Sequence, residues 1–494
     1  MQQRQIRLAV ALGCAFVIAC VIRFAFAHWD SIYDDAFIYL RYVRNLDNGC
    51  GLRFNCRGDA VEGFTGPLYV AVLWAGSLVT DRLIWLCQVV GTISLAVACS
   101  LAIMVAARLT DATRSPFAPA VLCLAVAAVL GLDDFAMLNA VIGLETAMAA
   151  AVFSLLALAA VTDRPRLLIA STCAFVLLRP EALVFVLALP ALPVIRRARY
   201  LIVVVGFVVF VTAVRYALFD SLLPNTYYAK SGGTLRHAVL GLAYIRDAII
   251  DFPLVILAPL ALWHARCRPV AFLLGGSAAW VAFFLRSGGD TFEYSRLVFP
   301  LVPVLSALAL AGVFELCARR WRLQVARAVV VAFAVAFAGR AWIAHAIPEQ
   351  HAHPRVVEWS ATGTYLRTHV PRGTLVATVP IGAIGYYSQL PILDLVGLTE
   401  PAIARAGRSV PVELLTKQWI AHERHNTEYV LARAPTWIVT TMVRDRAWTL
   451  ADARAGFWAD WLLLQEIKTG RAPFHVHDAE VTPGRHVLMF ERDR

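Results

Sequence analysis

Charged residues are scarce in this sequence: they make up 16% of its 494 residues, against 60% hydrophobic residues. A soluble protein could not cover that much apolar surface with so few charges, so the composition excludes an ordinary soluble domain and predicts an integral membrane protein. The net charge of +11 would suit a nucleic-acid partner in a soluble chain. No basic stripe with interleaved aromatic residues is present, so we expect no nucleic acid and attribute the charge to arginines in cytoplasmic loops.

The motifs of common cofactor sites are also missing. The sequence has no CxxC, HExxH or GxGxxG pattern and no ATP-type P-loop, so zinc, haem and nucleotide-binding folds have no support. Chemistry at the external face of the membrane must therefore use a substrate that arrives already activated. We expect no required cofactor; a divalent metal is compatible with the acidic residues, but nothing in their spacing calls for one. His351 and His353 in "EQHAHP" are interpreted as part of a linker.

Long apolar runs take up the first two thirds of the chain. We predict eleven transmembrane helices, at 8–27, 83–107, 117–132, 145–161, 167–178, 182–195, 200–219, 249–263, 270–285, 297–317 and 328–346. The first run is longer than a signal-peptide core and no cleavage site follows it. The stretch 66–79 is too short to span, so we expect a helix that lies in the membrane interface.

Arginines predict the orientation. With the N-terminus inside, every predicted cytoplasmic loop carries at least two of them: Arg4, Arg7; Arg108, Arg114; Arg164, Arg166; Arg196, Arg197, Arg199; Arg266, Arg268; Arg319, Arg320, Arg322, Arg327. The positive-inside rule then places the N-terminus in the cytoplasm and the C-terminus in the periplasm of a bacterial inner membrane.

The composition changes near residue 348. We expect residues 1–347 to form a transmembrane catalytic domain with a first periplasmic loop at 28–66, and residues 348–494 to form a periplasmic domain. In this tail, "PTWIVTTMV" and "RHVLMFER" are typical of strands, and helical stretches lie between the strand-like runs. The tail is therefore predicted to be a mixed α/β domain.

Polar clusters gather on the predicted external side of the membrane. They comprise Asp34, Asp35 and Glu62 in the first loop, Glu145, Arg179, the stretch "LPNTYYAK" at 223–230, and Asp290 and Arg296 in "RSGGDTFEYSR". Loops are polar in any protein, so each cluster alone is a weak signal. Arg179-Pro180-Glu181 is a stronger one, because ions inside an apolar hairpin are costly and usually functional.

The first external loop also contains two cysteines six residues apart, Cys50 and Cys56. In an oxidising periplasm they are expected to form a disulfide that closes a small loop, and the alternative is two unpaired thiols.

Several blocks resemble one known family. The opening block "DDAFIYLRYVRNLDNGCGLRFNCRGDAVEGFTGPLY" and "LPNTYYAK" are the most specific; "GLET", "LLRPEAL", "GGD" followed by "SRLVFPLVP", and "ILDLVGLTEPAIA" extend the match in order. Together they resemble the polytopic GT-C glycosyltransferases, in particular the mycobacterial terminal arabinofuranosyltransferases. The tail is shorter than in that group and the first loop carries cysteines, which leaves the acceptor open.

The resemblance implies transfer of a sugar, arabinofuranose by the nearest group, from a polyprenyl phosphate donor to a glycan, lipid or protein acceptor at the periplasmic face. A hexose such as mannose on the same carrier is the second option.

Removal of the acceptor's hydroxyl proton requires a base, and two close carboxylates raise the proton affinity of one partner, so Asp34 and Asp35 are the catalytic candidates. The alternative is N-capping of the helix that follows, and the sequence does not separate the two residues.

Cations and hydroxyl-bearing side chains complete the expected site. Lys230, Arg296 and Arg179 are the predicted contacts of the donor phosphate, because guanidinium and ammonium groups bind phosphate oxygens. The alternative for each is a side chain that extends to the membrane interface. The predicted sugar or acceptor contacts are Glu62, Asn225, Tyr227, Tyr228, Glu145 and Asp290; structural roles for the tyrosines are an equal alternative.

Two other functional classes remain open at this point. A lipid-carrier transporter would need a polar path through the bundle, whereas the charges here gather at one face. A non-catalytic membrane scaffold would keep its function after Asp34 or Asp35 is replaced.

The first prediction concerns orientation. Reporter fusions after Arg199 and Arg327 should report a cytoplasmic location, and a fusion after Pro348 should report a periplasmic one. A cytoplasmic location for the tail would contradict the predicted orientation or the predicted number of spans.

Overall fold

The computed structural model describes residues 2–109, 118–230, 233–263, 267–292, 294–320, 323–344, 354–414, 416, 420, 422–454 and 456–493. The chain forms two units. The first comprises Met1–Ser31, Trp85–Phe210 and Gly241–His351, and the second comprises Ile32–Ile84, Val211–Leu240 and Ala352–Arg494. The expected domain boundary at 347/348 and the pair His351 and His353 lie outside the described residues. Most of the first loop and part of the segment before residue 240 group with the tail.

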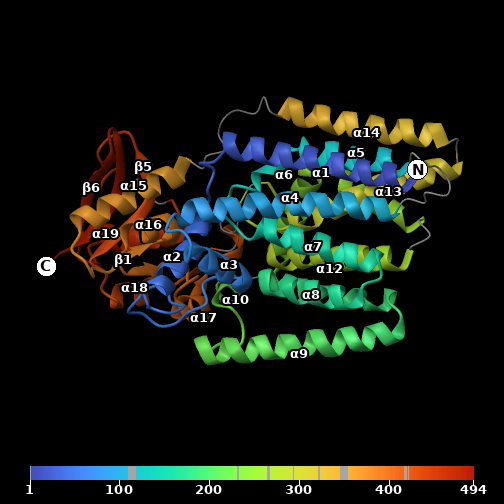
Figure 1. Cartoon of the computed structure of the whole chain (residues 1–494). Coiled ribbons are helices and arrows are strands. Elements are labelled where there is room, and N and C mark those ends of the chain that lie inside the picture. The colour runs from blue at the N-terminus through green and yellow to red at the C-terminus, as the bar shows by residue number, and fades with distance from the viewer. Residues whose placement is uncertain are drawn as a thin grey trace. The chain divides into compact units, whose positions relative to one another are not determined.

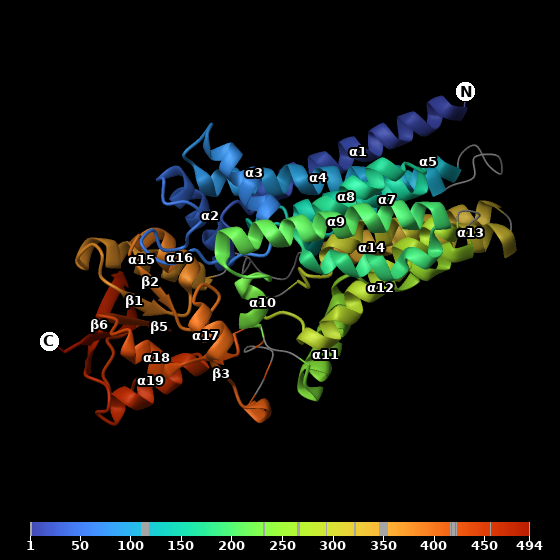
Figure 2. The same cartoon turned by 90° about the horizontal axis from the view of Figure 1, so that it is seen from below.

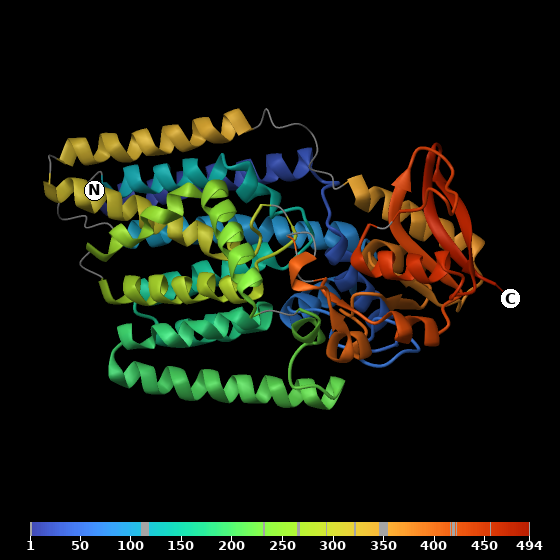
Figure 3. The ribbon, with the colours of Figure 1, turned by 180° about the vertical axis from the view of Figure 1, so that it is seen from behind.

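Helices build the first unit, and most of the long ones, among them α1, α4, α7, α8 and α12, run alongside one another in Figures 1 and 3. They are α1 (Gln2–Ala27), α4 (Leu83–Leu109), α5 (Ala118–Gly131), α6 (Asp134–Leu138), α7 (Thr146–Val161), α8 (Pro165–Leu178), η1 (Pro180–Ala191), α9 (Val194–Phe219), α11 (Leu235–Asp251), η2 (Pro253–Trp263), α12 (Cys267–Ser287), η3 (Phe299–Leu301), α13 (Val302–Arg320) and α14 (Leu323–Ala344). Along the chain, α9 and α11 each continue across the border between the units. Helices satisfy their own backbone hydrogen bonds, as the interior of a bilayer requires.

Each predicted span has a helix. Five are long and apolar enough to cross a membrane: Gln3–Ala27, Leu83–Leu109, Arg197–Phe219, Arg268–Ser287 and Phe299–Arg319. The other predicted spans correspond to shorter apolar helices: Ala118–Gly131, Thr146–Val161, Pro165–Leu178, Pro180–Ala191, Pro253–Trp263 and Gln324–Phe337. The chain is therefore an integral membrane protein.

Two of the short segments are 3₁₀-helices rather than α-helices. Pro190 lies inside η1 and Pro259 lies inside η2, and proline cannot donate a backbone hydrogen bond. A 3₁₀-helix rises about 2.0 Å per residue, against about 1.5 Å in an α-helix. The twelve residues of η1 therefore extend about 24 Å instead of about 18 Å. This geometry lets a short apolar segment cover most of a bilayer's hydrocarbon thickness.

Glycines allow close helix packing in the first unit. A Cβ atom on Gly312 of α13 would lie 2.4 Å from the backbone nitrogen of Ala261 in η2. A Cβ atom on Gly276 of α12 would lie 2.1 Å from the ring of Phe185 in η1. The two 3₁₀-helices are thus held by neighbours whose glycines leave room for them.

The second unit contains a five-stranded sheet within its described residues, in the order β2-β1-β5-β7-β6. The strands are β1 (Val376–Thr378), β2 (Ile392–Asp394), β5 (Trp437–Arg444), β6 (Phe474–Thr482) and β7 (Arg485–Arg492). β1 is parallel to both β2 and β5, with Ala377 opposite Leu393 and Ile438, whereas β7 is antiparallel to β5 and β6. A short antiparallel pair joins β3 (Arg408–Ser409) to β4 (Arg424–His425).

Helices cover both faces of this sheet. The helices of the unit are α2 (Asp34–Asp47), α3 (Pro67–Ser77), α10 (Asn225–Ala229), α15 (Pro354–His369), α16 (Ile381–Ser388), α17 (Pro401–Ala406), η4 (Val412–Leu414), α18 (Thr427–Ala432) and α19 (Trp458–Lys468). In Figure 2, α15 and α16 lie on one side of the sheet and α18 and α19 on the other. Leu463 and Leu464 of α19 pack with Ile438, Leu488 and Phe490 in a buried core. The predicted mixed α/β tail is confirmed.

The close packing of α13 predicts a stability change. In Gly312→Ala, the new Cβ would meet backbone atoms of η2 that cannot move independently, so we expect a loss of about 1–3 kcal/mol, as in other overpacked sites. Thermal unfolding of the purified full chain in detergent measures it as a lower Tm.

Gly206→Ala is the matched control, because no atom lies within 4 Å of its Cβ position in α9. Alanine is also the better helix former, so this variant should keep or slightly raise the Tm. Equal Tm values for Gly312→Ala and the wild type would contradict the packing argument.

Candidate active site

Asp34 and Asp35 begin α2, and Asp34 contacts the tail. The N-cap residue of α2 is Tyr33, whose side chain makes no capping hydrogen bond. The Asp34 carboxylate instead accepts hydrogen bonds from two backbone N–H groups, that of Ala383 to Oδ1 at 2.7 Å and that of Gly382 to Oδ2 at 3.2 Å. Both donors lie in the first turn of α16. Asp34 therefore caps a helix that lies 348 residues further along the chain, not its own helix.

The buried environment of Asp34 raises the pKa of its carboxyl group. Burial is the main cause that raises the pKa of Asp34 to about 7, and the nearby charge of Asp35 raises it further. The hydrogen bonds from the N–H groups of Ala383 and Gly382 lower the pKa but do not outweigh burial. Asp35 is only half-buried, and it points about 100° away around the helix from Asp34. Two adjacent carboxyls in different environments are a common arrangement for moving a proton.

Glu62 forms a buried ion pair with Arg215 of α9. The Arg215 Nε donates to Glu62 Oε2 at 2.5 Å, and both side chains are almost fully buried. Burial raises the pKa of Glu62, while the hydrogen bond from Arg215 and its charge lower it. The sequence signal for Arg215 was its place inside the apolar run 200–219, where a charge needs a partner.

Asn225 connects three of the blocks that carry the family resemblance. Its backbone N–H donates to the backbone oxygen of Glu62 at 3.0 Å, and its side-chain Nδ2 donates to the backbone oxygens of Gly397 and Leu398 at 2.8 and 2.9 Å. Its Oδ1 is buried and has no hydrogen-bond partner among the described residues. The amide thus holds the first loop, the "LPNTYYAK" block and the "ILDLVGLTEPAIA" block together. Binding of sugar by Asn225 stays a prediction.

The rest of the "LPNTYYAK" block presents aromatic rings and cations. Tyr227 is exposed, and its ring meets that of Tyr228 edge-on at 5.7 Å. The guanidinium of Arg405 lies 4.7 Å from the centre of the Tyr228 ring and donates to Ser221 Oγ at 2.8 Å. Lys230 is exposed at the end of α10. The sequence patterns did not single out Arg405, although it directly follows the "ILDLVGLTEPAIA" block.

The remaining predicted residues form two ion pairs in the first unit. Arg179 Nη2 lies 2.7 Å from Glu145 Oε1, and Arg296 Nε lies 2.5 Å from Asp290 Oδ2. All four side chains are almost fully buried. Both predicted phosphate-binding arginines therefore have a carboxylate that neutralises them, and the paired charges explain how such groups are tolerated in apolar surroundings.

The predicted site residues thus fall into two sets. The second unit contains Asp34, Asp35, Glu62, Asn225, Tyr227, Tyr228 and Lys230, and the first unit contains Glu145, Arg179, Asp290 and Arg296. Within each set the residues come from separate stretches of the chain. Their roles in binding or catalysis remain predictions.

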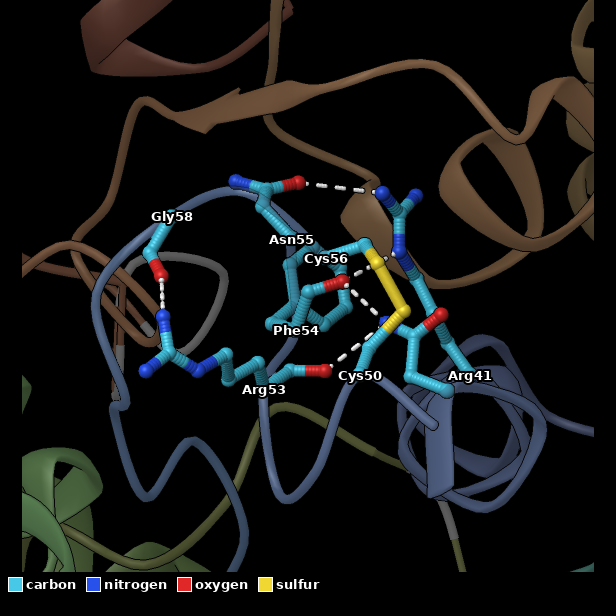
Figure 4. Close-up of a disulfide and its surroundings, with 8 residues drawn as sticks. Arg41, Cys50, Arg53, Phe54, Asn55, Cys56 and Gly58 are labelled. Carbon is cyan, nitrogen blue, oxygen red and sulfur yellow. Dashed lines mark hydrogen bonds between the residues drawn. A yellow bond between two sulfur atoms is a disulfide. The ribbon is translucent and has the colours of Figure 1, made fainter. Parts of the chain in front are cut away.

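A disulfide joins Cys50 to Cys56, with their Cα atoms 5.1 Å apart. Figure 4 shows how the loop it closes lies against Arg41 of α2. Arg41 donates to the backbone oxygen of Phe54 at 2.7 Å and to Asn55 Oδ1 at 3.0 Å. Asn55 also exchanges hydrogen bonds with the backbone of Ile392, the first residue of β2. The closed loop therefore presents Asn55 to the edge of the tail's sheet.

Metal ligands do not cluster in the part of the chain that the structure describes. Among those residues, no group of three or more histidine, cysteine, aspartate or glutamate side chains is placed to hold a metal ion.

Comparisons with known proteins place this geometry in a known fold. A family model described as "Domain of unknown function (DUF8728)" matches residues 345–483, and no curated protein matches the sequence. A crystal structure of ArnT from Cupriavidus metallidurans bound to undecaprenyl phosphate matches with a TM-score of 0.54 and 14% identity. The apo state of the same protein matches with a TM-score of 0.56 and 14% identity. Each match covers 96% of this chain and 97% of the other.

The chain has the ArnT fold. This finding confirms the predicted fold class, a polytopic GT-C-like helical membrane protein with a C-terminal mixed α/β domain. At 14% identity the match concerns the fold alone.

The raised pKa of Asp34 predicts how stability depends on pH. The folded chain holds the proton of Asp34 up to about pH 7, whereas an ordinary aspartate with a pKa of 3.8 releases it earlier. The stability from this group is therefore complete below pH 3.8 and is lost as the pH rises through about 7. In Asp34→Asn, which is neutral at every pH, the Tm relative to the wild type should increase between pH 5 and pH 8.

Thermal unfolding of both proteins across this range measures the difference. Asp47→Asn, at the exposed end of the same helix, is the matched control. A relative Tm that falls as the pH rises would mean that the N-terminus of α16 keeps Asp34 ionised, contrary to this prediction.

Proposed function

We propose that the protein is a membrane glycosyltransferase that uses a polyprenyl-phosphate-linked sugar as its donor. The observation that carries this proposal is the carboxylate pair at the start of α2, in a chain that shares its fold with ArnT over 96% of its length. One of the two matched ArnT structures has undecaprenyl phosphate bound, which supports a lipid phosphate as the donor's carrier. Such a donor brings its own activation and needs no nucleotide at the external face.

Asp35 is the proposed general base. Asp34 already accepts two hydrogen bonds from α16 and is almost fully buried, whereas Asp35 is more exposed. In the proposed step, a hydroxyl oxygen of the acceptor attacks the anomeric carbon of the sugar and its proton moves to Asp35. The bond between the anomeric carbon and the phosphate oxygen breaks, and polyprenyl phosphate leaves with both electrons of that bond.

The phosphate needs cations to stabilise the charge that develops on the leaving group. Lys230 and Arg405, which lie in the second unit with Asp35, are proposed for this role. Phosphate binding by Arg179 and Arg296 of the first unit is a separate proposal. Lys230 and Arg405 are exposed and have no ion-pair partner among the described residues, whereas Arg179 and Arg296 are each paired with a carboxylate. An arginine in such a pair still positions a phosphate through its remaining N–H groups.

Arabinofuranose is the proposed sugar, on the family resemblance of the opening block, and a polyprenyl-phosphate hexose of the mannose type is the alternative. The proposed acceptor is a glycan, lipid or protein of the cell envelope. The reaction is proposed to take place at the periplasmic face of the bacterial inner membrane, with the N-terminus in the cytoplasm.

Loss of the base should slow turnover without loss of the fold. Asp35→Asn keeps the size of the side chain and removes its charge, so we expect turnover to fall by about 100-fold or more. The measurement is donor consumption by the purified full chain, with polyprenyl-phosphate arabinofuranose and polyprenyl-phosphate mannose supplied in parallel.

Asp47→Asn on the same helix is the control and should keep wild-type turnover. Near-normal turnover in Asp35→Asn would refute the assignment of Asp35 as the base, and near-normal turnover in Asp34→Asn as well would refute a catalytic role for either residue. Failure of the wild type to consume either donor would refute the choice of these two sugars.

A further inference from the structure

Helices α2 and α16 lie along each other, and polar side chains of α2 bind the backbone at both ends of α16. Asp34 binds the N–H groups at the amino end of α16, as described above. At the carboxyl end, Arg44 Nη1 donates to the backbone oxygen of Tyr386 at 2.9 Å and Arg41 Nη2 donates to that of Leu390 at 2.7 Å. The N-terminus of a helix carries partial positive charge and its C-terminus partial negative charge. Each end of α16 therefore meets a polar side chain of α2, with the Asp34 carboxyl group at the amino end and two guanidinium groups at the carboxyl end.

The spacing of these charges matches the length of α16. From Asp34 to Arg41 is seven residues, which corresponds to a rise of about 10.5 Å in an α-helix. The eight residues of α16 extend about 12 Å. One helix in the first loop thus reaches both ends of a helix in the tail.

Two glycines let the helices approach this closely. A Cβ atom on Gly382 would lie 2.0 Å from the backbone oxygen of Asp34, and one on Gly385 would lie 2.5 Å from Arg41 Nη1. Between these points, the buried ring of Phe37 contacts the rings of Tyr386 and Tyr387 at 5.4 and 5.5 Å. The contact is continuous along α16 and leaves α2 little freedom to rotate or slide.

This contact determines where Asp35 points. Asp35 is the neighbour of Asp34 on the same helix turn, so the hydrogen bonds of Asp34 to Gly382 and Ala383 set the rotation of α2 and with it the direction of the Asp35 side chain. A displacement of about 1 Å in a reacting group costs about 100-fold in rate. The direction of Asp35 thus depends on a helix that the chain forms almost 350 residues later.

We infer that α16 of the tail is a positioning element for catalysis, in which Gly382 and Ala383 hold Asp34 and thereby aim Asp35 at the acceptor hydroxyl. The inference rests on the proposed function and extends it. It assigns to the tail a part in the chemical step. Arg41 and Arg44 are positioning residues of the same device, because they hold the opposite end of α16.

Gly382→Ala tests the inference directly. The added Cβ meets a backbone atom of Asp34 and must push α2 away from α16. We expect kcat to fall about 10-fold to 100-fold per folded molecule. The affinity for undecaprenyl phosphate should change by less than about 3-fold, because none of the proposed phosphate contacts belongs to α2 or α16. Gly206→Ala, whose Cβ would lie in open space, should leave both values unchanged.

A second series covers the case in which Gly382→Ala does not fold. Arg41→Lys keeps the charge at the carboxyl end of α16 but loses the planar fork, and Arg41→Met loses both. Turnover should decrease in the order wild type, Arg41→Lys, Arg41→Met, with unchanged binding of undecaprenyl phosphate. A purely structural role would instead lower the folded fraction and leave kcat per folded molecule the same.

Asp35→Asn in the same assay separates this inference from the proposed function. Active Asp35→Asn would refute the catalytic assignment itself. If Asp35→Asn is inactive but folded Gly382→Ala keeps the wild-type kcat, the positioning role of α16 is refuted and the catalytic assignment stands. If Gly382→Ala does not fold, a wild-type kcat in both Arg41 variants has the same meaning.

Discussion

The hydrogen bonds between the Asp34 carboxylate and the first turn of α16 connect the first loop to the tail. The first N–H groups of a helix have no partner within the helix, so an acceptor from elsewhere in the chain satisfies them. Here that acceptor is the carboxyl group of Asp34, which in its ionised form also complements the partial positive charge of the helix end. The contact is possible only because Gly382 has no side chain, since a Cβ atom there would lie 2.0 Å from the backbone oxygen of Asp34. The other contacts of α2, through Arg41 and Arg44, extend the same connection to the far end of α16.

Paired charges recur among the buried residues of the two predicted sets. Glu62 and Arg215, Glu145 and Arg179, and Asp290 and Arg296 each form a close pair with little exposure to solvent. An isolated buried ion would be very costly, and removal of one partner from such a pair leaves the other uncompensated. The pairs therefore constrain which segments lie together in each unit. Lys230 and Arg405, by contrast, are exposed in the second unit.

Two amide side chains, one of them in the loop that the disulfide closes, connect segments of the second unit that are far apart in the chain, as the Glu62–Arg215 ion pair does. The Cys50–Cys56 loop holds Asn55 against the first residue of β2, and Asn225 binds the backbone just beyond β2. Tyr42 of α2 donates to the backbone oxygen of Val61 and accepts from the N–H of Gly63, so the backbone on both sides of Glu62 is held as well. The first loop is thus an integral part of the second unit, with its acidic side chains in defined positions.

The sequence by itself determined the membrane class, the positions of the apolar helices, the strands β5 and β7 of the tail and the blocks that resemble GT-C enzymes. These properties depend on composition and on short-range patterns, which are legible without neighbours in space. It also identified Asp34 and Asp35 as a pair, but it left them equivalent. Only the tertiary structure distinguishes them, because Asp34 binds the first turn of α16. The tertiary structure also shows that Arg215 pairs with Glu62 and that Arg405 stacks on Tyr228. Each of these contacts joins residues far apart in the chain and depends on which side chains meet after folding, so no local pattern reports it.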